Sequence, residues 1–127
     1  MNNPQQLADR YVAVWNETDM HARRRAIAEL WTPDGTHYVD TREARGYDAL
    51  EKRITGSHEK NVRDGGHRFQ AVKGARALRN AVTFFWEMLP ADGEKIVATG
   101  LVFLIIDGQG RILVDYLFVL DRTLAPA

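Results

Sequence analysis

The second half of the chain is made almost entirely of strand-like segments, and this feature limits the possible folds more than any other. Four runs rich in β-branched and aromatic residues occupy about residues 67–79, 81–89, 95–106 and 111–120. The segments PADGE and DGQG, which separate the later runs, are typical of hairpin turns. Consecutive strands joined by tight turns predict an antiparallel meander, and 127 residues suffice to bury a core against it.

The first half has the periodicity of helices. Asn3 and Pro4 are typical of a helix start, and apolar residues then recur three and four positions apart. We expect a second helix over roughly residues 20–30, a TPDG turn, a short strand, and a third helix at about 47–60. Helices segregated from an antiparallel sheet predict the α+β class.

The last two predicted strands are apolar on both faces. In LVFLII and in YLFVL, alternate positions of either parity carry large apolar side chains. A sheet covered by helices on one face normally shows polar residues on the other. We therefore expect the outer sheet face to be buried in a homodimer, with a sheet curled around its own core as the alternative.

Composition excludes several classes of function. Lys and Arg together number 17, as do Asp and Glu, so no net charge attracts nucleic acid or anionic membranes. The absence of cysteine excludes disulfides, thiolate catalysis and cysteine-based zinc sites. We see neither a signal peptide nor a run long enough to span a membrane. These features predict one cytoplasmic domain over residues 1–127.

Several segments resemble one known family. DRYVAVWNETD at residues 9–19 resembles the first helix of ketosteroid isomerases, and ELWTPDGTHYVD resembles their helix, turn, strand and terminal Asp. Gly46 lies where that family opens its third helix, and DGQGRI resembles its last hairpin. Nearly the whole chain thus resembles the NTF2-like superfamily, in the branch of ketosteroid isomerases and SnoaL-like polyketide cyclases. The resemblance implies a cone-shaped fold with three N-terminal helices packed on a strongly curved antiparallel sheet.

The resemblance also implies a catalytic site. In ketosteroid isomerases an Asp base moves a proton next to a carbonyl, while a Tyr and a protonated Asp hold the enolate oxygen. Tyr11 matches that Tyr, and Asp40 matches the base if the strand is one residue longer than in the family. An ungapped alignment instead places Val39 there, and it places Val102 where the protonated Asp is expected. If DGQG is a four-residue loop, Val102 lies opposite Asp115, whose carboxylate would take over that role.

Each candidate also has a structural interpretation. Asp40 is equally consistent with capping the following turn or pairing with a nearby arginine. Tyr11 is typical of a core tyrosine, and Asp115 requires a wet pocket, a cation or an interface edge. His37 has the opposite strand parity from Asp40, and its separation from His67 fits no metal motif. We therefore expect these two histidines to be ordinary core or surface residues.

The predicted ligand pocket is apolar. Phe84, Trp86 and Met88 share a strand parity and would form a wall suited to a flat ligand, although core packing explains them equally well. The predicted substrate-binding residues are Trp15, Trp31, Phe84, Trp86, Met88 and Val102. The ARRRA segment at residues 22–26 spreads its arginines around a helix, which predicts a solvated face.

These features predict a small-molecule enzyme of the ketosteroid isomerase type. It would transfer a proton next to a carbonyl of an apolar or aromatic cyclic ligand, as an isomerase, a cyclase or a dehydratase. Asp40, Tyr11 and Asp115 are the predicted catalytic residues, and neither a metal nor an organic cofactor is needed. The alternative is a non-catalytic NTF2-like module for ligand binding or dimerisation.

Overall fold

The chain consists of helices and strands that alternate in its first half, followed by strands alone. The computed structural model describes residues 3–120. In chain order the elements are α1 (Pro4–Asn16), α2 (Met20–Leu30), β1 (Trp31–Val39), β2 (Arg42–Arg45), α3 (Tyr47–Ser57), the π-helix η1 (His58–Asp64), β3 (His67–Ala71), β4 (Arg76–Leu78), β5 (Ala81–Pro90), β6 (Ala98–Ile106) and β7 (Ile112–Leu120).

The helix starts follow from local sequence. The Asn3 side chain accepts a hydrogen bond from the Gln5 backbone N–H, and Pro4 occupies the first turn, which confirms the predicted start of α1. The second helix is also confirmed within the predicted range. The third continues beyond its predicted end, because α3 passes directly into η1, which ends at Asp64.

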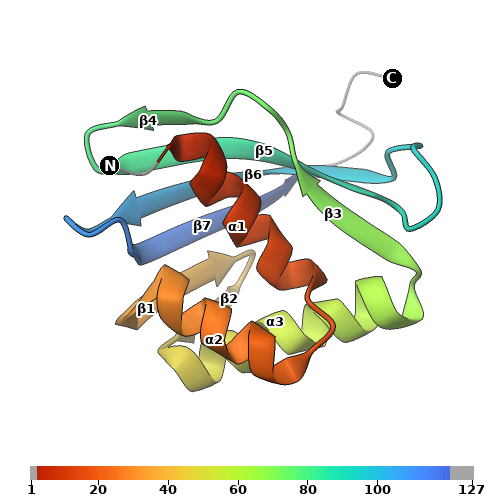
Figure 1. Cartoon of the computed structure of the whole chain (residues 1–127), viewed down its shortest axis with the longest axis horizontal. Helices are drawn as coiled ribbons and strands as arrows, with labels where there is room; N and C mark the ends of the chain where they lie inside the picture. The colour runs from red at the N-terminus through yellow and green to blue at the C-terminus, as the bar shows by residue number, and fades with distance from the viewer. Residues whose placement is uncertain (1–2, 121–127) are drawn as a thin grey trace.

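All strands join one mixed sheet in the order β2-β1-β7-β6-β5-β3, with β4 also paired to β5. The predicted meander is confirmed for β5, β6 and β7, which pair antiparallel. The expectation of a wholly antiparallel sheet is wrong, because β1 pairs parallel with β7. Figure 1 shows α1 crossing one face of this sheet, and the strong curvature predicted from the resemblance is not confirmed.

Several strand boundaries differ from the prediction. The run at residues 67–79 breaks into β3 and β4, and Gly74 between them has a φ of +98° that favours glycine. Strand β2 was not predicted. The TPDG segment lies within β1, where the pairing with β7 skips from Trp31 to Thr36, so these residues form an irregularity in the strand and not a turn.

The predicted pairing of Val102 with Asp115 is wrong. A register shift between Ile105 and Ile106 places Leu104 opposite Asp115 and Leu117 opposite Val102. The four-residue loop assumed for DGQG does not account for this irregularity. The observed partner of Asp115, Leu104, lies two positions from the predicted partner, Val102. A shift of two residues keeps the side chain on the same face, so Asp115 still points inward as predicted.

The two faces of the sheet differ in burial. The inner face packs on the helices and carries Val102 and Leu104, which are fully buried. The outer face carries Phe85, Phe103, Tyr116 and Phe118, of which Phe118 is 51% exposed. The prediction of two apolar faces is therefore confirmed, and the outer one lies open on the isolated chain.

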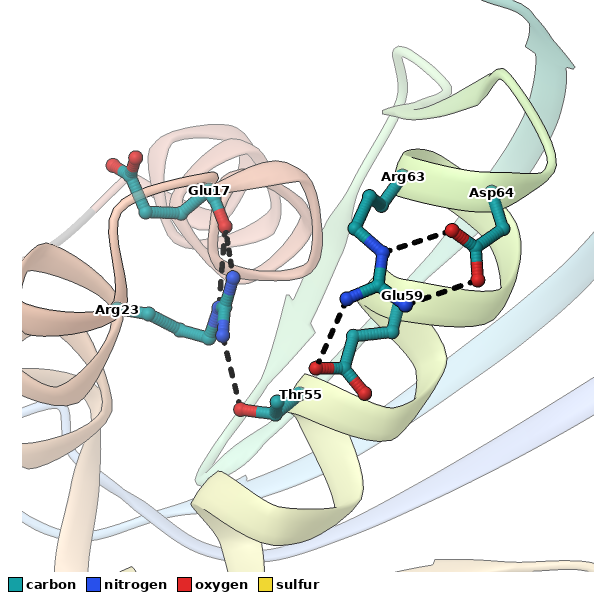
Figure 2. Close-up of polar contacts among 6 residues, drawn as sticks. All are labelled: Glu17, Arg23, Thr55, Glu59, Arg63 and Asp64. Carbon is teal, nitrogen blue, oxygen red and sulfur yellow. Dashed lines mark hydrogen bonds and ion pairs between the residues drawn. The ribbon is translucent and has the colours of Figure 1, made fainter.

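Arg23 corrects the prediction that the ARRRA segment is a solvated face. Only 4% of Arg23 is exposed. Its guanidinium donates to the Glu17 carbonyl at 2.6 and 3.1 Å and to the Thr55 hydroxyl at 3.0 Å, joining the α1–α2 connection to α3 (Figure 2). Arg63, drawn in the same view, instead pairs on the surface of η1 with Glu59 and Asp64.

Candidate functional site

A buried carboxylate occupies the centre of the inner face. Asp115 on β7 is completely buried, yet three side chains contact its two oxygens. The His37 Nδ1 atom lies 2.6 Å from Oδ1, the Tyr11 hydroxyl donates to Oδ1 at 3.2 Å, and the Trp31 indole N–H donates to Oδ2 at 3.0 Å. Such hydrogen bonds offset the unfavourable desolvation of a buried charge.

The fold brings these four residues together from distant parts of the chain. Because β1 and β7 pair in parallel, His37 and Asp115 are direct neighbours in the sheet. Trp31 is the first residue of β1, and Tyr11 projects from the buried face of α1. The structure thus brings together two of the predicted catalytic residues, Tyr11 and Asp115, while their catalytic role stays a prediction.

The hydrogen-bond roles in the cluster follow from charge. Burial, and then the negative charge of Asp115, raise the pKa of Tyr11 well above its ordinary value, so Tyr11 stays protonated and donates. If Asp115 is ionised, its carboxylate only accepts, and the His37 Nδ1 atom is then the donor of this contact. The His37 Nε2 atom is buried and has no hydrogen-bond partner within residues 3–120.

Two adjoining cavities lie beside the cluster. His37, with Val39 and Asp40, lines an outer cleft of about 1190 Å³. An inner pocket of about 90 Å³ is bounded by Tyr11 and by aromatic side chains. The two share five lining residues, namely Arg53, Ser57, Asn61, Leu117 and Val119. The site is therefore a cleft with an apolar recess, and His37 lies at its wall.

Arg53 is the charged residue at the junction of the two cavities. Its guanidinium carbon lies 5.1 Å from the centroid of the Trp15 ring, and its Nε is buried without a partner in the described part of the chain. Burial, and then the nearby charge of Arg42, lower the pKa of Arg53 below its ordinary value. Guanidinium groups nevertheless remain protonated in proteins, so Arg53 presents a positive charge to the cleft.

The structure does not bring Asp40 to the Asp115 cluster. Asp40 is exposed, in the turn between β1 and β2, with a φ of +54° that Asp tolerates better than most residues. It lines the outer cleft together with His37. The assignment of Asp40 as a base stays a prediction.

The predicted substrate-binding residues divide between cavity and core. Trp15 and Trp86 line the inner pocket. Phe84 packs edge-on against Tyr11, and Trp31 and Val102 are completely buried, while Met88 packs at the margin of the core. Within residues 3–120, no group of three potential ligands is placed to hold a metal ion.

Sequence reasoning missed two features of this site. His37 was set aside because its parity differs from that of Asp40, yet that parity directs it inward to Asp115. No pattern in the sequence marks Arg53, because one arginine on an amphipathic helix is usually solvated. The signal for the cluster was the lone carboxylate at position 115, which requires a wet pocket, a cation or an interface edge.

Comparisons with known proteins agree with this architecture. A family model described as the SnoaL-like domain matches residues 8–114. The matched segment contains Tyr11, His37 and Arg53 and ends one residue before Asp115. Comparison with curated proteins gives no match. The described part of the chain contains no helix long and apolar enough to cross a membrane.

Solved structures share the fold at low sequence identity. A candidate isomerase of the SnoaL-like family from Agrobacterium tumefaciens superposes with a TM-score of 0.80 at 23% identity, over 91% of this chain and 96% of that one. A candidate polyketide cyclase from Sinorhizobium meliloti gives 0.66 at 12%, over 88% and 93%. An NTF2-like protein from Exiguobacterium gives 0.68 at 18%, over 91% and 98%.

The helices, the mixed sheet and the enclosed polar cluster thus define an α+β protein with the NTF2-like fold. Because the family model covers most of its length, the chain belongs to the SnoaL-like family.

Proposed function

We propose that this protein transfers a proton at a carbon next to a carbonyl, with His37 as the base. The observation that carries the proposal is the 2.6 Å contact of His37 Nδ1 with Asp115, while Nε2 of the same cleft-lining histidine has no partner in the described chain. A histidine oriented by a buried carboxylate is an effective general base near neutral pH.

In the proposed reaction, His37 Nε2 takes a proton from the carbon next to the carbonyl. The electrons of the C–H bond move to the carbonyl oxygen, giving an enolate, and Asp115 stabilises the resulting imidazolium. Return of the same proton to another carbon completes an isomerisation. Attack of the enolate on a second carbonyl, with the His37 proton passing to the new alkoxide, would give a cyclisation. Loss of a β-hydroxyl, which leaves as water with that proton, would give a dehydration.

Donors without partners line the inner pocket. The indole N–H of Trp86 and the Nε of Arg53 are both buried and lack hydrogen-bond partners in the described chain. Either group is free to donate to an enolate oxygen, which such donors stabilise strongly in a site with little water. Tyr11, predicted for this role, already donates to Asp115 and supports the base instead.

Hydrogen–deuterium exchange of ketones tests the proposal. Cyclic ketones such as 2-tetralone and 5-androstene-3,17-dione are incubated with the protein in deuterated buffer, and loss of the proton next to the carbonyl is followed by NMR. We expect catalysed exchange that falls by about 10³–10⁴-fold in Asp115→Asn, by analogy with other oriented histidines. His37→Gln should abolish it.

The same assay separates the alternatives. Asp40 lines the cleft with His37 and is therefore the second candidate for the base. Loss of exchange in Asp40→Asn with retention in His37→Gln would move the role to Asp40. Ligand binding without any exchange across the ketone panel would favour a non-catalytic binding module.

We also propose that the protein is a homodimer through its outer sheet face. Phe103 on β6 and Tyr116 on β7 lie 6.2 Å apart between ring centroids, and Tyr38 stacks on Tyr116 at 5.4 Å. Together with Phe85 and Phe118 they form an exposed aromatic surface across four strands. A second copy of the chain, packed through the same face, would bury this surface.

A further inference from the structure

Arg53 is a partly buried cation that no anion contacts, although the charge of Asp115 acts on it from a distance. Within residues 3–120, it makes neither a hydrogen bond nor an ion pair, and its Nε is shielded from solvent. The Trp15 ring at 5.1 Å offsets only part of the lost hydration. Burying a charge without a contacting counter-ion is unfavourable. An anion that binds the Arg53 guanidinium in this position would therefore be held strongly.

The surrounding cleft has the same sign of charge. Four cationic side chains line the outer cleft, namely Arg42, Lys52, Arg53 and Lys60, against the two carboxylates Asp40 and Glu43. The whole chain has a net charge of zero, so this excess is local. A concave surface with such an excess attracts anionic ligands.

The position of Arg53 relative to His37 makes it suitable for holding a substrate. The Trp15 ring contacts both, since its centroid lies 5.5 Å from the His37 ring and 5.1 Å from the Arg53 guanidinium. Beyond Arg53 lies the inner pocket, with Phe69 and Leu117 among its walls. A ligand whose acidic group binds Arg53 can therefore keep an apolar body in the recess and a carbon near His37.

We propose that the substrate is a carboxylic acid, bound through its carboxylate to Arg53. This inference rests on the proposed function, which it extends by naming the class of substrate. Two carboxylate oxygens match the planar donor fork of a guanidinium. Arg53 offers a single guanidinium beside a mainly apolar recess, which matches a monoanionic carboxylate on an apolar body; a phosphate is the competing anion in the test.

Calorimetric binding of three matched probes tests the proposal. These are 2-naphthoate, its neutral amide 2-naphthamide, and 2-naphthyl phosphate, all at low ionic strength. We expect wild-type protein to bind the carboxylate at least tenfold more tightly than the amide. In Arg53→Met this preference should disappear. Equal affinities in the wild type, or a preference that survives in Arg53→Met, would overturn the proposal.

Two further variants keep the test specific. Arg63→Met removes an arginine that is already paired on the surface with Glu59 and Asp64, and it should leave all three affinities unchanged. Arg53→Lys keeps the charge without the planar fork and should keep part of the preference, which provides a readout if Arg53→Met folds poorly. Tighter Arg53-dependent binding of the naphthyl phosphate than of 2-naphthoate would also refute the choice of a carboxylate.

The inference and the proposed function fail in different ways. His37→Gln should abolish proton exchange but keep the Arg53-dependent preference for 2-naphthoate. Exchange of 2-tetralone that is faster than that of a tetralone carboxylic acid would support His37 as a base and contradict the acidic substrate. A carboxylate preference without exchange of either ketone would contradict the base and leave the anion site intact.

Discussion

At the scale of single residues, the site depends on one carboxylate with three donors. Tyr11, Trp31 and His37 together satisfy both oxygens of Asp115, so loss of one donor leaves a buried charge partly unpaired. Hydrogen bonds to charged groups contribute about 1.5–3 kcal/mol each. The cluster therefore has a structural role in addition to the proposed chemical one.

We expect Tyr11 to make the free energy of unfolding depend on pH in the alkaline range. We expect Tyr11→Phe to lower the free energy of unfolding by about 1.5–3 kcal/mol at pH 8. Burial raises the pKa of Tyr11 in the folded state, whereas in the unfolded state its pKa is about 10. Above about pH 10 the unfolded chain loses this proton and the folded chain keeps it, so stability falls as the pH rises.

Urea unfolding of wild type and Tyr11→Phe at pH 8 and at pH 10.5 measures this effect. The stability advantage of the wild type should shrink at the higher pH, because only the wild type releases the Tyr11 proton on unfolding. If the difference in free energy of unfolding between wild type and Tyr11→Phe were the same at both pH values, burial would not raise the pKa of Tyr11 in the folded state.

At the scale of elements, close packing between β5 and β6 shapes the inner pocket. Gly100 on β6 pairs with Trp86 on β5, and a Cβ at position 100 would lie 2.2 Å from the Trp86 ring and 2.3 Å from the Phe118 carbonyl oxygen. We expect Gly100→Ala to lower the free energy of unfolding by about 3 kcal/mol. Since Trp86 lines the inner pocket, ligand affinity should fall as well.

Gly56→Ala is the matched control for this substitution. Gly56 lies within α3, and a Cβ there would meet nothing within 4 Å. Alanine in a helix interior should raise the free energy of unfolding by about 0.5–1 kcal/mol. Chemical denaturation of both variants tests the comparison, and an equal effect of the two would contradict the packing argument.

The elements also show what could be predicted from the sequence. The start of α1 was predictable because its signals, Asn3 and Pro4, are local. The strands that pair with their sequence neighbours were predictable for the same reason. The register of β6 with β7 was not, because no local sequence signal marks the shift between Ile105 and Ile106. The pairing of His37 with Asp115 was missed because it needs a parallel contact between distant strands.

At the scale of the whole molecule, the exposed outer sheet face is the proposed dimer interface. We expect the protein to be a dimer at micromolar concentration, and Phe103→Lys combined with Phe118→Lys to be monomeric, because each places a charge on the aromatic surface. Analytical ultracentrifugation measures this. Met20→Lys is a suitable control, since Met20 is 53% exposed on α2 and not on the sheet. A monomeric wild type would show that the outer face is not paired.

The parallel pairing of β1 with β7 also has a consequence for how the chain acquires its site. His37 and Asp115 are 78 positions apart, so their contact closes one of the longest loops in the fold. Contacts between distant segments form slowly, and a nascent chain cannot make this one until β7 has left the ribosome. Until then β1 has β2 on one side but lacks β7 on the other, and Tyr11 and Trp31 have no Asp115 carboxylate to bind. The residues that would carry out the chemistry therefore come together only when β7 pairs with β1. We expect activity to appear only in chains that have completed this late step of folding.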